Sequence, residues 1–506
     1  MSDGQLAQAV FDDLNKDRSA VVDRAKLCAE LTIPYLYTED GSSQSDDLTR
    51  EYVQGYGAKI VNHLVGKFAL SILPPSQPFY RLAATEEAMQ AMTNGDDEMK
   101  YQVEKVLAIK EEGILRYINK SRFRKSLYPA LKQAMVIGDS LIEKLEDEVY
   151  RVLNLKNYVV KRDAAGTIIE LVIRESLKYE TLPEDIKSEI KEEDKDSEIF
   201  LYTRTYLDDD GKYQKFQEVN EKIVAESEET LTELNDVYIS VRWTKIDGED
   251  YGRSFVEEHL GTLISLNKQL RVVNQSAVVS SKIVHTVNPN GMTKYSDFVN
   301  ALNGDVIIGN ETDIGTVQNG KGADLVPSMQ LIQDYKRELA EAFLMSSASI
   351  RDAERVTAHE VQLVASELEA SFGGIYTALA DDIQIPLIEN AMATLEIEGN
   401  DDVDVIITAG IEALGRNVEL NKVNNLIQEL VLLQGLIGED EVKKIVNGEA
   451  FASSMVVNSG VAGKDFILPQ SRVDSKEIKE KKDAVGDTVI QGAAAEAGKS
   501  VVNAQQ

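Results

Sequence analysis

The stretch SFVEEHLGTLISLNKQLRVVNQSAVVSSKIV, residues 254–284, decides the fold because it predicts one unusually long helix. Ser254 stands three residues before Glu257, which is the spacing of a capping box that opens a helix. Apolar residues then recur at helical spacing, and no proline occurs until Pro289. At 1.5 Å per residue, thirty residues give a rod of about 45 Å. We therefore expect a first rod over residues 253–285.

A compact segment and a second rod follow the first. Residues 286–327 contain the runs VNPNGMT, GDVIIGN and GTVQNGKGADLVP, which predict turns and short strands. Apolar spacing then predicts a second rod over residues 328–345, with Ser328 as its N-cap. Two rods thus flank a small, loop-rich module.

The residues after the second rod predict a polar connector, a helix and a strand. The connector covers residues 346–356. Thr357 and Glu360 then have the spacing of a second capping box. The run VDVIITAG predicts a strand, so that residues 357–410 form a helical return with a strand at its end.

Two features interrupt the helix that begins at Thr357. Gly373 and Gly374 are adjacent, and a glycine pair weakens and can kink a helix. Pro386 predicts the end of this helix near residue 384 and a separate helix over about 385–396.

The first half of the chain predicts helices and then a β-rich insertion. Helices are expected at 4–31 with a break near Arg18, and at about 47–72, 96–119 and 122–136. From 150 to 245 the apolar period becomes two, and the segments YVVKRDAAGTIIELVIRE and FLYTRTYLDDDGKYQKFQEV predict two hairpins. The fold class is therefore mainly α with β insertions. A further helical segment is expected over roughly 417–447, and a mobile tail over 471–506.

Composition excludes several classes of protein. The chain has 506 residues, a formal net charge of −32 and one cysteine, Cys28. This length suggests about three structural units, and a single cysteine fits a reducing compartment. The acidic N-terminus predicts no secretory signal, and no apolar run approaches the ~20 residues that cross a bilayer. The strong negative charge argues against tight coating of DNA, which needs lysines and arginines at the phosphates.

The sequence contains no complete motif for an enzyme, a metal site or a cofactor site. GTVQNGKG has the spacing of a phosphate-binding loop, but Gly322 replaces the required Ser or Thr and Pro327 follows closely. The acidic run Asp208–Gly211 fits a hairpin turn better than a calcium loop. The four histidines are far apart in the sequence. We therefore expect no catalytic residues, no metal and no cofactor.

Basic residues on and near the rods are the candidates for contact with a nucleic acid. Arg351 and Arg355, in the polar connector, are the strongest of them. The others are Lys268, Arg271, Lys282, Lys336 and Arg337. The alternative for each is a solvated or salt-bridged helix face.

Several longer stretches resemble the portal, or head-to-tail connector, proteins of short-tailed phages. They are VVKRDAAG (159–166), LPEDI (182–186), DGEDYGRSFVEEHLG (247–261), SSKIVHTVNPNG (280–291), ERVTAHEVQLVASELEASFGGIY (354–376) and GIEALGR (410–416). The resemblance covers roughly residues 10–435. It implies a ring, usually of twelve subunits, at one vertex of the capsid, through which double-stranded DNA is packaged and ejected.

The resemblance also assigns a part of the ring to each segment. Residues 1–252 and 357–410 would form the wing, 253–285 and 328–345 the stem, 286–327 the clip, 346–356 the channel loop and 411–470 the crown. The implied partners are the terminase large subunit, the major capsid and scaffolding proteins and the tail adaptor, with no membrane. The implied location is the portal vertex of the virion, after assembly in the host cytoplasm.

Two other functions remain open at this point. One is a different ring component of the head-tail junction, such as an adaptor or a tail-tube protein. The other is an acidic cytoplasmic enzyme of several domains, against which the missing nucleotide and metal motifs count.

The residues themselves favour a ring. Two amphipathic rods joined by a compact module cannot bury all their apolar faces within one thin hairpin, so packing against neighbouring copies is the natural solution. An acidic wall would let DNA pass without adhering, and a few cationic side chains at a constriction would hold it.

Overall fold

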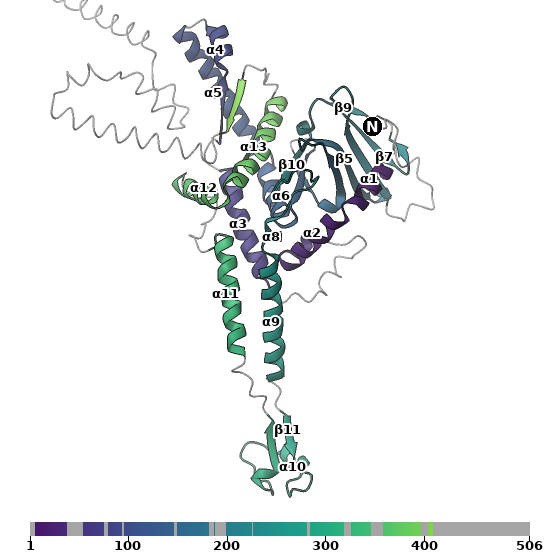
Figure 1. Cartoon of the computed structure of the whole chain (residues 1–506), viewed down its shortest axis with the longest axis vertical. Helices are drawn as coiled ribbons and strands as arrows, with labels where there is room; N and C mark the ends of the chain where they lie inside the picture. Colours follow the sequence, from purple (N-terminus) through teal and green to yellow (C-terminus); the bar gives the residue numbers. More distant parts are fainter. Residues whose placement is uncertain are drawn as a thin grey trace, which may run out of the picture.

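The computed structural model arranges the chain along one long axis (Figure 1). A body holds most of the elements, two helices project from it as a rod pair, and a small distal module lies at the far end. The described residues are 6–37, 54–74, 79–93, 96–145, 149–181, 187, 199–224, 226–280, 284–317, 325–345, 358–395 and 403–407.

Helices make up most of the body beside the β-rich part (Figure 1). They are α1 (Ala7–Asp17), α2 (Ser19–Leu31), α3 (Tyr56–Ile72), α4 (Glu86–Thr93), α5 (Asp97–Lys120), α6 (Phe123–Ile137), α8 (Phe255–Glu258), α12 (Ala358–Phe372) and α13 (Gly374–Thr394). The predicted break near Arg18 is confirmed. The Arg18 guanidinium donates to the carbonyl oxygens of Leu155 and Tyr158 at 2.7 and 2.6 Å, which fixes the junction of α1 and α2 against the β-rich part.

The β-rich part is built from antiparallel strands. The larger sheet has the order β4 (Tyr158–Arg162), β5 (Ile168–Leu177), β6 (Ile199–Leu207), β7 (Tyr213–Val219) and β8 (Lys222–Ile223), and β9 (Glu229–Leu231) also pairs with β7. Both predicted hairpins are confirmed, and the run Asp208–Gly211 forms the turn between β6 and β7, with Gly211 at φ +80°.

Two smaller sheets show that the β structure extends beyond the predicted segment 150–245. One has the order β10 (Tyr238–Arg242), β2 (Asp139–Lys144) and β3 (Tyr150–Leu153); the other pairs β1 (Tyr80–Ala84) with β13 (Val403–Ile407). The strand predicted in VDVIITAG is therefore β13, which joins the return of the chain to its first quarter.

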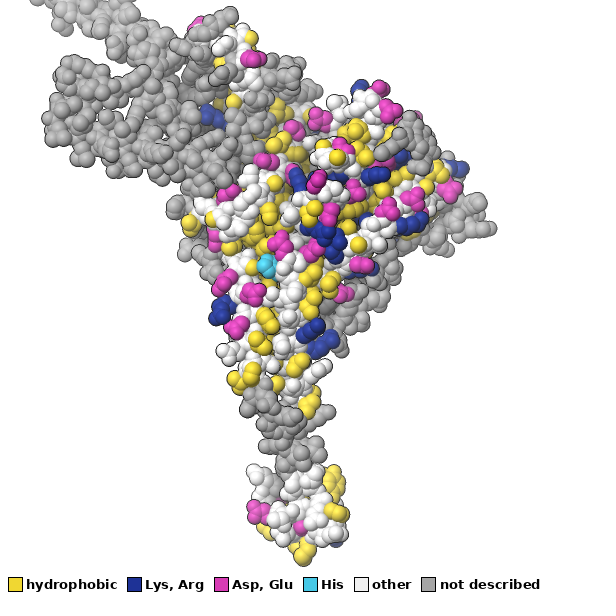
Figure 2. Space-filling model, viewed as in Figure 1, with side chains coloured by type: hydrophobic (Ala, Val, Ile, Leu, Met, Phe, Trp, Pro, Cys, Tyr) yellow, Lys and Arg dark blue, Asp and Glu magenta, His cyan; other side chains and the backbone are white. Residues whose placement is uncertain are grey.

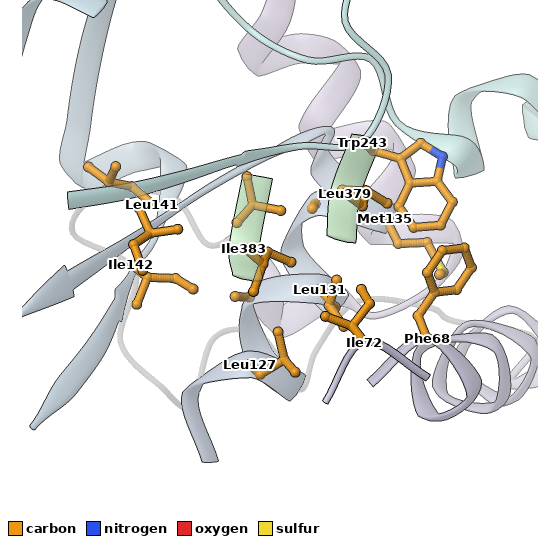
Figure 3. Packing of buried hydrophobic residues seen from close by; sticks show 14 of the residues in the cluster. Phe68, Ile72, Leu127, Leu131, Met135, Leu141, Ile142, Trp243, Leu379 and Ile383 are labelled. Carbon is orange, nitrogen blue, oxygen red and sulfur yellow. The ribbon is translucent and has the colours of Figure 1, made fainter. Parts of the chain in front are cut away.

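One apolar core connects these layers (Figure 3). Phe68 and Ile72 of α3, Leu131 and Met135 of α6, and Ile383 of α13 are fully buried in it. Burying residues of this size stabilises the fold by roughly 1.5–3 kcal/mol each. The core therefore holds α3, α6 and α13 together as one unit, in the body from which the rods project.

A close backbone contact places the start of the first rod. Gly138 ends α6 with φ +101°, and a Cβ atom there would lie 2.3 Å from the carbonyl oxygen of Gly252. Only glycine avoids this clash. The approach lets the chain that enters α8 cross the end of α6.

The first rod differs from the continuous helix predicted over 253–285. The chain forms α8, turns at His259, and continues as α9 (Leu260–Ser280), about 31 Å long. Val284 already belongs to strand β11, so the predicted end was also wrong. The break follows from tertiary packing, because the Phe255 ring lies 4.9 Å from the His259 ring and 4.8 Å from Phe343.

The second rod is α11 (Val326–Ala342), which begins two residues before the predicted start. The prediction of Ser328 as N-cap was wrong, since Leu325 occupies that position and Ser328 lies in the first turn. Pro327 explains the earlier start, because its fixed φ and missing N–H suit the first turn of a helix.

The kink at Gly373 is confirmed, and the helix end before Pro386 is not. Gly373 separates α12 from α13 with φ +51°, and Gly374 is the first residue of α13. Helix α13 then continues through Pro386, whose neighbours Ile383 and Leu387 are fully buried. Burial on both sides of the proline compensates for the hydrogen bond that it cannot donate.

Candidate ring interface and DNA channel

The rod pair is an antiparallel helical hairpin that extends beyond the body. Leu263 of α9 and Leu339 of α11 are fully buried. Near the body, Thr262 Oγ1 donates a hydrogen bond of 3.1 Å to Glu338 Oε1, which places these two residues side by side. Toward the distal end, apolar side chains become exposed: Val272, Val278, Val279, Val326, Met329 and Leu331. The hairpin alone therefore does not bury its apolar surface.

Ser254 is the N-cap of the first rod as predicted, but the described hydrogen bonds do not include the return bond of a capping box, from the Ser254 N–H to the Glu257 carboxylate. Ser254 Oγ accepts a hydrogen bond of 2.9 Å from the backbone N–H of Glu257. The Glu257 carboxylate accepts from Arg253 Nη1 at 2.8 Å and lies 3.5 Å from Arg24 Nε. The cap is thus tied to both the preceding loop and α2.

An aromatic cluster attaches the rods to the body. The ring of Trp243, which follows β10, lies 4.9 Å from Phe68 of α3, 5.7 Å from Phe255 of α8 and 6.0 Å from Phe372 of α12. Phe255 in turn contacts Phe343, just after α11. One cluster therefore joins both rods to three parts of the body, and Figure 3 shows Trp243 above Phe68.

A buried lysine holds the end of the second rod. Lys67 of α3 is fully buried, and its Nζ donates to the Leu344 carbonyl oxygen at 3.0 Å and pairs with Glu367 Oε2 of α12 at 2.7 Å. His63 Nε2 lies 3.2 Å from the same carbonyl oxygen. Burial, and then the nearby Lys67 charge, lower the pKa of His63, so that His63 is neutral at pH 7. Leu344 has φ +50°, which is rare for a residue other than glycine.

Replacing Lys67 with methionine is expected to lower the free energy of unfolding by about 1–3 kcal/mol, since it leaves the Leu344 carbonyl and the Glu367 carboxylate without this donor. Chemical denaturation followed by circular dichroism measures the change. Lys59→Met, on an exposed position of the same helix, is the control and should change stability by less than about 0.5 kcal/mol. Equal stability of Lys67→Met and the wild type would show that the pair contributes nothing.

The distal module has no apolar core of its own. It contains β11 (Val284–Val287), α10 (Tyr295–Asn300) and β12 (Ile314–Val317), and β11 pairs with β12. Among its described side chains, the buried ones are Thr293 and Asp313. Asp313 Oδ2 accepts hydrogen bonds from Met292 N, Thr293 N, Thr293 Oγ1 and Asn310 N at 2.9–3.3 Å. These hydrogen bonds lower the pKa of Asp313, those from Thr293 most.

The apolar side chains of this module lie on its surface. They are Met292, Tyr295, Val299, Leu302, Val306 and Ile308, each more than half exposed. An isolated two-stranded sheet is at best marginally stable in water. Exposed apolar side chains around a polar centre therefore indicate that the module completes its packing with another protein chain.

The structure separates the predicted cationic residues. Lys336 Nζ lies 5.8 Å from the centre of the Tyr56 ring, so it packs against α3. Arg337 is exposed and pairs with Asp334 at 2.8 Å. Lys268 and Arg271 are exposed on α9. These four residues form no single patch.

The remaining predicted residues cannot be compared with the structure. Lys282, Arg351, Arg355 and Thr357 lie outside the described residues, as do the predicted crown and tail. Glu360 lies in α12, near its start at Ala358, and its side chain is not described.

Sequence reasoning missed Lys67, Asp313 and Trp243. Lys67 interrupts the apolar run LVGKFALSI, which was the one available signal for a buried charge. Nothing in the local sequence distinguishes Asp313 from the many other carboxylates. Within the described ranges, no group of His, Cys, Asp or Glu could hold a metal ion, and no helix is long and apolar enough to cross a membrane.

The chain is similar over most of its length to known phage proteins. The family model described as bacteriophage head to tail connecting protein matches residues 4–464. The portal protein of Enterobacteria phage T3 is 34% identical over 456 residues, covering 87% of this chain and 84% of that protein. The portal protein of Escherichia phage T7 is 35% identical over 438 residues, covering 83% and 81%.

A chain from the neck of an empty GTA particle, computed with C6 symmetry, aligns with 12% identity and a TM-score of 0.38, covering 76% of this chain and 90% of that one. The match of the family model to most of the chain, together with identities of 30–35% to several portal proteins, establishes the relationship. The chain belongs to the bacteriophage head to tail connecting protein family.

Proposed function

We propose that this chain is a phage portal protein, whose copies form a ring-shaped channel at one capsid vertex for the entry and exit of double-stranded DNA. The observation that carries this proposal is the exposed apolar surface of the rod pair and the distal module. Apolar side chains are exposed on both, and the described part of the module has no buried apolar side chain. Neighbouring copies in a closed ring would cover these side chains. Twelve copies are the number that the family resemblance implies.

The parts of the structure correspond to parts of such a ring. The body would be the wing, α9 and α11 the stem, and the distal module the clip, which would dock the terminase large subunit and later the tail adaptor. Residues 346–356 would be the channel loop, and residues 411–470 a crown that faces the capsid interior with its scaffolding and major capsid proteins. The protein would assemble in the host cytoplasm and remain at the portal vertex of the virion.

Purification followed by mass measurement and negative-stain electron microscopy tests this function. The expected result is a ring with a central channel. A compact monomer at all concentrations would contradict the proposal and favour the alternative of an acidic enzyme. A ring that binds a preassembled tail but never the terminase would favour an adaptor or tail-tube protein.

Cationic side chains near the constriction are proposed to hold the packaged DNA. Arg351→Ala and Arg355→Ala are expected to leave ring assembly intact and to increase the loss of packaged DNA several-fold, because each removes a phosphate contact. Nuclease protection of DNA in filled capsids measures the loss. The control is Arg116→Ala, on an exposed position of α5. Normal DNA retention in both variants would contradict a role of these arginines in the channel. Alanine variants of the weaker candidates, Lys336, Arg337 and Lys282, are tested in the same way.

A further inference from the structure

The two rods differ in charge. The chain carries a net charge of −32, yet no aspartate or glutamate occurs between Glu258 and Asp297. Helix α9 lies in this segment and carries Lys268 and Arg271. Helix α11 carries three acidic and two basic residues. One rod is therefore basic and the other is net acidic.

The charged residues lie on the outer faces of the rod pair. Successive residues turn by about 100° around a helix, so Lys268 and Val272 lie opposite the face of α9 that Leu263 and Leu266 bury. By the same geometry Asp334 lies on the side of α11 away from the buried Leu339. Figure 2 shows Lys and Arg side chains at the α9 edge, and acidic side chains beside basic ones at the α11 edge.

Lys268 and Asp334 lie at almost the same position along the axis of the rod pair. The hydrogen bond between Thr262 and Glu338 gives a common origin for the two antiparallel helices. Lys268 follows Thr262 by six residues, which is about 9 Å along the axis, and Asp334 precedes Glu338 by four, which is about 6 Å in the same direction. The difference of about 3 Å is well within the reach of a lysine side chain.

Apolar residues match in the same register. Val272 lies about 15 Å and Val326 about 18 Å from that origin, again in the same direction. Val272 is 48% exposed and Val326 60% exposed. The outer faces thus offer a cation opposite an anion. A valine lies beside a valine further along, one turn beyond Lys268 on α9 and two turns beyond Asp334 on α11.

We propose that the outer face of α9 in one copy packs against the outer face of α11 in the next, with Lys268 paired to Asp334 and Val272 beside Val326. This contact rests on the proposed ring and specifies its interface. Two different faces meet, so the contact is heterologous and can repeat around a closed ring. In the single chain Asp334 pairs with the exposed Arg337; such surface pairs contribute little, so the exchange of partner costs little.

A second copy fits this surface better than DNA does. DNA would use the basic residues of α9 alone and would leave Val272 and Val326 exposed. Packing between copies uses the opposite charges and covers both valines. Contact of Lys268 with DNA is the alternative that the experiment below distinguishes.

Charge reversal tests the contact. Lys268→Glu and Asp334→Lys each place like charges opposite each other in a ring of one variant. Each is expected to raise the protein concentration for half-assembly about tenfold at low salt, and less at high salt, where charges are screened. An equimolar mixture of the two variants is expected to assemble again, since copies can alternate so that every contact has opposite charges.

The control substitutions make the same charge changes at another exposed place in the chain. Lys212→Glu and Asp210→Lys make the same charge changes at the exposed β6–β7 turn and should assemble like the wild type. Wild-type assembly by both rod variants, or failure of the mixture to assemble, would overturn the contact. Normal assembly of Lys268→Glu with altered DNA retention would assign Lys268 to the channel instead. Absence of rings from the wild type would contradict the proposed function itself.

Crosslinking gives a second measurement that does not depend on loss of assembly. A Val272→Cys/Val326→Cys variant, treated with a short bismaleimide, is expected to give a ladder of trimers and larger species, and each single variant should give none beyond a dimer. Cys28 does not interfere, because it is buried and burial raises the pKa of its thiol to about 11. A double variant that forms no ladder, in preparations where rings are visible, would overturn the contact.

Discussion

Trp243→Ala is expected to lower the free energy of unfolding by about 3–5 kcal/mol. Trp243 is 2% exposed and packs against Phe68, Phe255 and Phe372. Its removal leaves a cavity where both rods join the body, and the rods should become more sensitive to proteolysis. Trp243 is the only tryptophan, so unfolding must be followed by circular dichroism rather than by fluorescence.

Trp243→Phe separates ring packing from polar interaction. Trp243 Nε1 has no hydrogen-bond partner within the described part of the chain. Phenylalanine keeps an aromatic ring at the centre of the cluster, so we expect a smaller loss of about 1–2 kcal/mol. A loss as large as that of alanine would mean that the indole nitrogen, rather than packing, stabilises the joint.

Asp313→Ala is expected to unfold the distal module while the body and the rods stay folded. The carboxylate accepts four hydrogen bonds, and no described apolar side chain of the module is buried to replace them. Limited proteolysis should cut within residues 284–317 at least about tenfold faster than in the wild type. Binding of the terminase or the tail adaptor should be lost if this module is the docking site.

The control for this variant is Asp297→Ala, which removes an exposed carboxylate of the same module. It should leave both the cleavage rate and docking unchanged. Asp313→Asn keeps an acceptor oxygen without the charge and should be intermediate. An Asp313→Ala module that resists protease like the wild type would show that other contacts hold it.

The same carboxylate predicts the acid sensitivity of the module. Hydrogen bonds to Asp313 lower its pKa in the folded chain, so its contribution is fully present above the ordinary aspartate pKa near 4. That contribution is lost as the pH falls through the lower folded pKa. Faster cleavage of the module should therefore appear in the wild type only below about pH 4, and Asp313→Asn should remove this pH dependence.

Local patterns in the sequence were sufficient for elements whose cause is local. The two hairpins of the larger sheet, the N-cap at Ser254 and the kink at Gly373 follow from side-chain period, capping chemistry and glycine conformation. The general order of a rod, a module and a second rod also follows from these signals. The family resemblance rested on ordered stretches of sequence and was confirmed by comparison with portal proteins.

Contacts between distant residues decided the rest, and no local pattern contains them. The turn at His259 depends on Phe343, and the continuation of α13 through Pro386 depends on burial of its neighbours. The apolar run around Lys67 hints at burial, but its partners Leu344, after α11, and Glu367, in α12, are brought to it only by the tertiary structure. The sequence alone determined the two hairpins, the N-cap at Ser254 and the kink at Gly373, because these depend on near neighbours. The tertiary structure alone decided where those segments stop, which charges are buried and which faces of the rods remain exposed, because burial is a property of the packed chain.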